Sequence, residues 1–195
     1  MNKTRRGLRL IRTIRDNRML KTVLIILAVI VVAFVVVVAV QPSDFRVARS
    51  ATIDAPPDVV FSHVNDLHKW QAWSPWAKLD PQCKFTFDGP ASGRDAVFGW
   101  SGNNEVGEGK MTIVESRPNA LVRIRLDFVK PFAATNMANF TFAPAGAGTS
   151  VTWAMTGERN FLFKAVGLFM DCDKMVGPQF EKGLAQLKSV SEASR

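Results

Sequence analysis

The 195-residue chain contains no tyrosine and has only two histidines, His63 and His68. No HExxH, CxxC or GxSxG motif is present, and the pair Gly107 and Gly109 lacks the third glycine of a dinucleotide-binding loop. The histidines stand five positions apart, a spacing that does not bring two metal ligands onto one helix face. We expect both to be surface or packing residues, and we predict no catalytic residue, no metal site and no cofactor.

Acids and thiols add little catalytic potential. Most strand carboxylates are solvated, and this is our expectation for four acids on predicted strands: Glu105, Glu108, Glu115 and Asp127. Asp171 and Asp173 could form a small oxygen-ligand site, but a cap at a helix N-terminus is the favoured interpretation. Cys83 and Cys172 are the only cysteines, so one disulfide is possible, although two unpaired, largely buried thiols are favoured.

Charge is concentrated at one end of the sequence. Charged residues make up 22% and hydrophobic residues 47%, which excludes a wholly disordered chain. The formal net charge is +8, but residues 1–21 contain eight Lys and Arg against Asp16 alone, so the remainder is nearly neutral. A neutral body has no basic face to neutralise several phosphates, so we predict no nucleic-acid partner.

An apolar run follows the basic tail. Residues 23–40 read VLIILAVIVVAFVVVVAV without a charge, about 27 Å of helix, and we predict a transmembrane helix at 22–41. Basic residues before a span stay in the cytoplasm. This predicts an inner-membrane protein with a cytoplasmic tail at 1–21 that contacts anionic lipids, and with a periplasmic body. The small residues near Ala39 also permit signal-peptide cleavage, but the long basic region favours a retained anchor.

The exported part alternates short patterns typical of strands with two kinds of helix. Period-two alternation bounded by turn residues predicts strands at 45–53, 83–88, 96–101, 107–116, 121–129, 136–143 and 149–157. A short helix is predicted at 57–66, and a longer one at 175–191 that starts or kinks at Pro178. A long antiparallel meander with one covering helix is an α+β arrangement, and we expect residues 43–195 to fold alone.

The inward faces follow from the same periodicities. In the strand at 121–129 the apolar residues share one parity, while Arg123, Arg125 and Asp127 hold the other. The predicted inward set on the strands and the final helix comprises Val122, Ile124, Leu126, Phe128, Phe140, Phe142, Val151, Trp153, Met155, Val176, Phe180, Leu184 and Leu187.

Several segments resemble a known superfamily. These are Arg49–Phe61 (RSATIDAPPDVVF), Val64–Trp70 (VNDLHKW) with Trp73–Trp76 (WSPW), Gly107–Ile113 (GEGKMTI) and Phe180–Leu184 (FEKGL). They are similar to START-like or Bet v 1-like helix-grip domains, and within these to bacterial polyketide cyclase/dehydrase-like proteins. The resemblance implies a curved antiparallel sheet of about seven strands around a long C-terminal helix at 44–192. It also implies a deep cavity, used elsewhere for lipids, sterols, polyketides or quinones.

Large apolar side chains are the candidate site residues. The tryptophan-rich segment contains Trp70, Trp73 and Trp76. Either these residues plug the end of the core, or two of them, Trp73 and Trp76, line the mouth of a cavity. The full predicted ligand-binding set is Trp73, Trp76, Trp100, Met111, Phe128, Phe132, Phe140, Trp153, Met170 and Met175.

Three functions fit these observations. The leading hypothesis is a membrane-anchored module that binds a hydrophobic small molecule, such as a lipid, quinone or polyketide-like compound, in an internal cavity. A cyclase/dehydratase-type enzyme is the alternative, weakened by the missing tyrosine and the lack of a convergent acid and base. An interaction domain with a filled core is the third. A cavity separates the first from the third, and ionisable groups buried inside it would favour the second.

Overall fold

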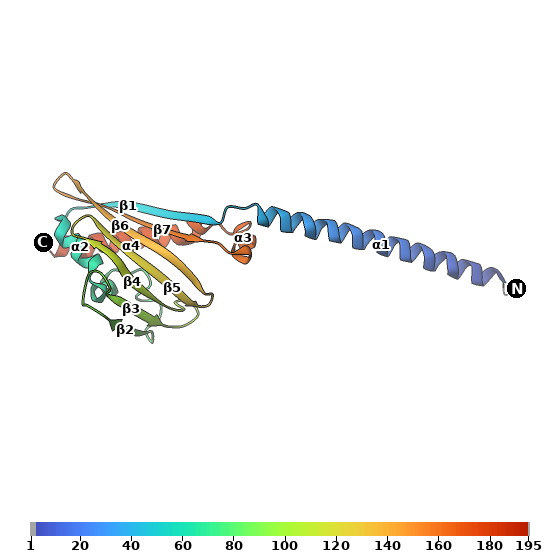
Figure 1. Cartoon of the computed structure of the whole chain (residues 1–195), viewed down its shortest axis with the longest axis horizontal. Helices are drawn as coiled ribbons and strands as arrows, with labels where there is room; N and C mark the ends of the chain where they lie inside the picture. Colours follow the sequence, from blue (N-terminus) through green and yellow to red (C-terminus); the bar gives the residue numbers. More distant parts are fainter. Residues whose placement is uncertain (1–2, 195) are drawn as a thin grey trace.

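The computed structural model describes residues 3–194, which form one long N-terminal helix and an α+β body (Figure 1). Helix α1 (Lys3–Ala39) projects away from the body, and its stretch Met19–Ala39 is long and apolar enough to cross a membrane. The chain leaves the helix at residues 40–43, about where the predicted span ends, and enters the first strand.

The body is built on a curved antiparallel sheet with the strand order β1-β7-β6-β5-β4-β3-β2. The strands are β1 (Asp44–Ile53), β2 (Lys84–Asp88), β3 (Val97–Ser101), β4 (Glu108–Arg117), β5 (Leu121–Lys130), β6 (Ala134–Ala145) and β7 (Gly148–Glu158). All seven predicted strands are present, with bounds shifted by at most two residues. The predicted helix-grip arrangement is therefore confirmed, because a single long helix also lies along this sheet (Figure 1).

The helices are α2 (Pro57–Asn65), the 3-10 helix η1 (Leu67–Ala72), α3 (Phe161–Gly167) and α4 (Cys172–Ala193). Helix α4 begins earlier than predicted and continues through Pro178. It begins there because the Asp171 carboxylate accepts a hydrogen bond of 2.9 Å from the Asp173 backbone N–H. The predicted cap is thus confirmed. Helix α3 was not predicted, although Asn160 marks its start by capping the Phe163 N–H at 2.9 Å.

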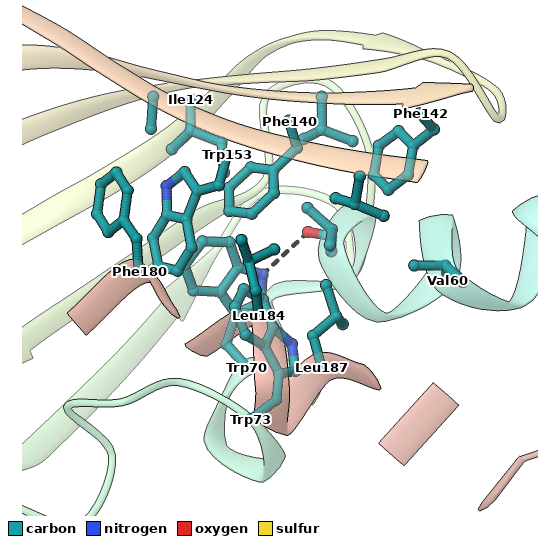
Figure 2. Packing of buried hydrophobic residues seen from close by; sticks show 14 of the residues in the cluster. Val60, Trp70, Trp73, Ile124, Phe140, Phe142, Trp153, Phe180, Leu184 and Leu187 are labelled. Atoms are coloured by element: carbon teal, nitrogen blue, oxygen red, sulfur yellow. Dashed lines mark hydrogen bonds between the residues drawn. The ribbon is translucent and has the colours of Figure 1, made fainter. Parts of the chain in front are cut away.

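The main core lies between the sheet and α4 (Figure 2). Trp153 of β7 stacks on Phe180 of α4 with ring centroids 4.0 Å apart, and on Phe140 of β6 at 4.8 Å. Gly183 permits this approach, because a Cβ at that position would lie 2.7 Å from the Trp153 ring. The predicted parity of β5 is confirmed, since Val122 and Ile124 are fully buried in this core.

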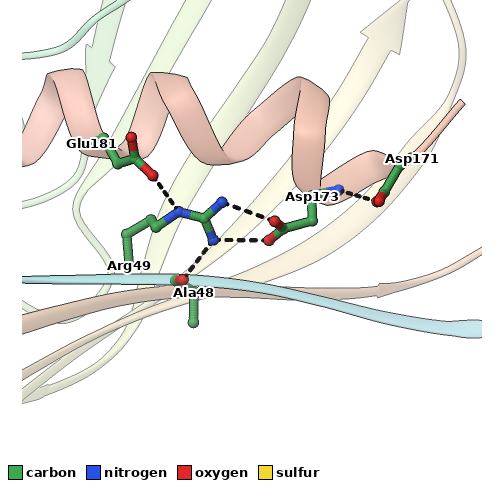
Figure 3. A network of polar contacts seen from close by, with 5 residues as sticks. All are labelled: Ala48, Arg49, Asp171, Asp173 and Glu181. Atoms are coloured by element: carbon green, nitrogen blue, oxygen red, sulfur yellow. Dashed lines mark hydrogen bonds and ion pairs between the residues drawn. The ribbon is translucent and has the colours of Figure 1, made fainter.

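An ion-pair network fastens the start of α4 to the edge strand β1 (Figure 3). The Arg49 guanidinium donates to both carboxylate oxygens of Asp173 at 2.8 Å and to Glu181 at 2.6 Å. Gly177 leaves room for it, because a Cβ there would collide with the guanidinium. Hydrogen bonding by Arg49 lowers the pKa of the Asp173 carboxyl, which therefore stays charged and paired at neutral pH.

The strand register defines two ends of the body. Asp44 lies opposite Glu158, and Glu108 lies opposite Lys130 and Ser101, so these residues share the end of the sheet from which α1 departs. We call this the α1-proximal end. The turn between β6 and β7 and the C-terminus of α4 lie at the opposite, distal end (Figure 1).

Candidate functional site

A cavity of about 330 Å³ lies beside the packed core, between the sheet, the tryptophan segment and the first turns of α4. Its volume is at the lower end of the range of about 300–1,000 Å³ typical of small-molecule sites. The wall consists of Trp70, Gln71, Ser74, Trp76, Ala77, Cys83, Phe85, Phe98, Trp100, Glu105, Val106, Met111, Leu126, Phe128, Lys130, Pro131, Ala138, Trp153, Met155, Val176 and Phe180.

The interior of the cavity is apolar and its charged groups lie at the rim. Phe98, Met111 and Ala138 are buried wall residues contributed by three strands of the sheet. Glu105 and Lys130 are exposed and lie in or next to the turns at the α1-proximal end. A ligand in this cavity therefore meets hydrocarbon along most of its length and charge only where it emerges.

Five predicted site residues line the cavity together: Trp76, Trp100, Met111, Phe128 and Trp153. They come from the tryptophan segment and from strands β3, β4, β5 and β7. Trp100 packs edge-on against Phe128 with centroids 5.8 Å apart, and Trp76 packs edge-on against Trp153 at 5.9 Å. The sheet curvature thus brings together aromatic rings that are far apart in the sequence.

Two other predicted residues, Trp73 and Phe140, lie in the packed core and not on the wall. Trp73 is fully buried, its Nε1 donates to the His63 carbonyl at 3.0 Å, and its ring centroid is 4.5 Å from that of Trp70. The tryptophan segment therefore does both things considered above. Trp70 and Trp73 fill the end of the core, and Trp76 together with Trp70 lines the cavity.

The remaining three predicted residues, Phe132, Met170 and Met175, are not on the wall but exposed, at 57%, 48% and 55%. Phe132 is in the loop that follows β5, beyond the point where the strand still faces the cavity. Met170 and Met175 lie at the junction of α3 and α4, on the outside of the body. Sequence periodicity could not detect this, because it carries no information on where an element leaves the body.

The ligand-binding set predicted from the sequence omits part of the cavity wall, notably Trp70, Phe98, Ala138, Met155 and Phe180. Strand parity correctly predicts that Leu126, Phe128, Trp153 and Met155 face inward. Adding every inward-facing residue near the α1-proximal end to the predicted set would have found most of the omitted residues. Ala138 carries no such signal, because a small side chain can equally well belong to a packed core.

Ionisable wall residues are few. Burial raises the pKa of the Cys83 thiol, so the thiol is neutral at pH 7 and a poor nucleophile. Cys83 and Cys172 are both free in the structure. Neither histidine lines the cavity. The His68 ring stacks on the Phe87 ring with centroids 4.1 Å apart. Burial lowers the pKa of His63, which favours the neutral imidazole. Across residues 19–194, whose side chains the structure describes, no cluster of three His, Cys, Asp or Glu side chains could hold a metal ion.

One wall residue also has a buried polar atom without a hydrogen-bond partner. Within the described part of the chain, no acceptor lies within hydrogen-bonding distance of Trp153 Nε1. By contrast, the indole Nε1 of Trp100, another wall residue, donates to the Val106 carbonyl at 3.3 Å. A buried N–H without a partner carries a desolvation cost.

Comparisons with known proteins agree with the helix-grip fold. A family model described as "Polyketide cyclase / dehydrase and lipid transport" matches residues 44–192. Among curated proteins no sequence match was found.

Solved structures share the fold at low sequence identity. Protein MLL2253 from Mesorhizobium loti is 15% identical with a TM-score of 0.57, covering 77% of this chain and 99% of its own. Ara h 8.0201 is 10% identical with a TM-score of 0.56, covering 77% and 99%. The di-domain ARO/CYC StfQ from the steffimycin biosynthetic pathway is 10% identical with a TM-score of 0.56, covering 78% and 52%. At these identities the likeness establishes the fold alone.

Proposed function

The chain belongs to the polyketide cyclase/dehydrase and lipid transport family, and from that premise we propose that it is a membrane-anchored module binding a hydrophobic small molecule in its internal cavity. The observation that carries the proposal is the cavity of about 330 Å³, with an aromatic and aliphatic interior and charge only at its rim. Such a wall gains binding free energy from buried hydrocarbon and offers little to a polar ligand.

The apolar wall also bounds the ligand class. Lipids, quinones and polyketide-like compounds all present the hydrocarbon surface that such a wall binds.

Binding rather than turnover is the function that this wall supports. A cyclase or dehydratase moves protons and needs a positioned acid or base within reach of the reacting atoms. The ionisable wall residues are Cys83, Glu105 and Lys130; the two charged ones are exposed and the thiol is neutral. We therefore assign these residues to the rim and give none of them a chemical step.

The stretch Met19–Ala39 supports membrane anchoring, because it is uncharged after Lys21 and follows a strongly basic tail. In this proposal the tail stays in the cytoplasm, near anionic lipid headgroups, and the body lies on the opposite side of an inner membrane. A phosphatase reporter fused after Arg195, active only after export, tests this orientation. Activity of a cytoplasm-only reporter at the same position would refute it.

A matched pair of substitutions on β6 tests ligand binding. Ala138→Phe places a phenyl ring in the cavity, whereas Ala143→Phe places the same ring on the exposed side of the same strand. We expect the full-length chain in nanodiscs to bind cis-parinaric acid, a ubiquinone analogue or a polycyclic aromatic compound. Ala138→Phe should abolish this binding, and Ala143→Phe should leave it unchanged.

Native mass spectrometry of the full-length chain extracted from its own membrane identifies the ligand. A small molecule retained by the wild-type chain and absent from Ala138→Phe is the expected result. No binding of any probe class and no retained molecule would refute the binding function. Chemical conversion of a bound probe would instead favour the enzyme.

A further inference from the structure

An apolar surface lies at the α1-proximal end, and its residues do not line the cavity. It combines exposed side chains of α3 and the turn after it with one from the β5–β6 loop: Phe132, Phe161, Leu162, Val166, Phe169 and Met170. We call these six residues the α3 platform. Phe169 is 81% exposed, and Leu162, Val166 and Met170 recur every fourth residue along one side of the helix and its extension. Phe132 joins the set because its ring packs edge-on against Phe163 of α3 at 5.6 Å.

The platform is adjacent to the C-terminal end of α1 (Figure 1). The two helices are in contact, and Val38 is fully buried although nearly all of Met19–Ala39 is exposed. The link from α1 to β1 is also held in place. Arg159, two residues before the start of α3, donates from Nη2 to the Pro42 and Asp44 carbonyls at 3.1 and 3.2 Å, and its backbone N–H donates to the Ser43 carbonyl at 2.7 Å.

These hydrogen bonds of Arg159 hold α3 next to the end of the apolar span. Since the span ends at Ala39 and the link to β1 is four residues long and bonded to Arg159, the body cannot extend away from a bilayer on a flexible tether. A bilayer crossed by α1 therefore has its surface beside α3. Large apolar side chains at that depth are transferred from water to the boundary between lipid headgroups and acyl chains, and this transfer stabilises the docked position.

The cavity reaches the same end of the body. Cys83, Val106 and Pro131 line it, and all three lie at the turns that define the α1-proximal end. Pro131 of the wall is next in sequence to Phe132 of the platform. The opening of the cavity and the platform are thus neighbouring parts of one surface.

We infer that the α3 platform is embedded in the outer boundary of the bilayer and that the cavity exchanges its ligand directly with the membrane at this surface. The inference rests on the proposed function, because it requires both a bound hydrophobic molecule and a membrane-spanning α1. Its occupant is a lipid bilayer surface. The location of the platform beside the end of the span distinguishes this occupant from a second copy or a protein partner.

Depth measurements test the location. In full-length protein with Cys83→Ser and Cys172→Ser, a fluorophore is attached at Phe169→Cys and, as control, at Ala147→Cys in the exposed β6–β7 turn of the distal end. In phosphatidylcholine and phosphatidylglycerol vesicles, lipids with a nitroxide near the carbonyl end of the acyl chain should quench the label at 169 and leave that at 147 unaffected. Equal, weak quenching at both positions would overturn the inference. So would a label at 169 shielded from water without nitroxide quenching, because this result indicates a protein partner.

Exchange kinetics test the role. Phe169→Asp should slow the transfer of cis-parinaric acid between the protein and vesicles by roughly tenfold, because a charge at this position opposes burial among acyl chains. Its equilibrium affinity should match that of the wild type, and Ala147→Asp should change neither quantity. An unchanged transfer rate would overturn the inference and leave the binding function intact. Failure of the wild-type chain to bind the probe would instead refute the proposed binding function.

Discussion

Truncation of Trp76 is the sharpest probe of the cavity wall. The Trp76 side chain is half-buried, lines the cavity and packs edge-on against Trp153 at 5.9 Å. An aromatic side chain buries about 150–250 Å² when fully covered. If a ligand covers about a third of the indole, Trp76→Ala removes roughly 50–80 Å² of contact, or about 1–2 kcal/mol at ~25 cal/mol per Å². The dissociation constant should then rise roughly 5- to 30-fold.

Two controls make this magnitude interpretable. Trp76→Phe keeps most of the flat apolar surface and should weaken binding by less than about threefold. Arg123→Ala removes bonds to Glu115 at 2.6 Å and Asn139 at 3.0 Å on the outer face of the sheet, far from the ligand. It should leave affinity unchanged.

The assay is a fluorescence titration of the full-length protein in nanodiscs with cis-parinaric acid, accompanied by thermal unfolding to verify that each variant is folded. Equal affinity of Trp76→Ala and wild type, or equal losses in Trp76→Ala and Arg123→Ala, would refute the assignment of Trp76 to the ligand site.

Three further predictions concern the framework of the site. Trp73→Ala should lower the free energy of unfolding by about 3–5 kcal/mol, measured by chemical denaturation, because its indole is fully buried in the core. Gly183→Val should lower it by about 1–3 kcal/mol, because the new side chain meets the Trp153 ring; a neutral effect would contradict the close approach of α4. Arg49 lowers the folded-state pKa of Asp173, so their contribution to stability is present above the unfolded pKa of about 4 and is lost as the pH falls through the folded value. Asp173→Asn should therefore lower the melting temperature at neutral pH and reduce its fall on acidification, and an unchanged pH profile would refute this coupling.

The sequence determined the local features of the protein. Eighteen successive apolar residues after a basic tail identify the apolar helix, since such a run has no polar stripe to face water. Alternation along residues 121–129 fixed which face of β5 is buried, because successive side chains of a strand point to opposite sides. The same argument located the other strands, and the segments resembling the helix-grip superfamily gave their arrangement.

Only the tertiary structure decided which inward residues meet the cavity. Trp73 and Trp76 are three residues apart and chemically identical, yet one is in the packed core and the other on the wall. The difference arises from contacts with distant residues: the Trp73 indole meets the His63 carbonyl and Trp70, whereas Trp76 faces the space left beside Trp153. Periodicity assigns a side chain to a face, but it does not specify how far along that face α4 covers the sheet.

The position of the site relative to the apolar helix was also decided by the tertiary structure. Helix α3 and the Arg159 bonds connect the end of α1 to the turns around the cavity opening, although Pro42 and Arg159 are separated by most of the body in sequence. Phe132, Met170 and Met175 look like core residues by composition and are exposed. Phe132 lies in the loop beyond the paired part of β5, whereas Met170 and Met175 lie at the junction of α3 and α4. Hydrophobicity alone predicted burial for them, and the tertiary structure places them at the surface.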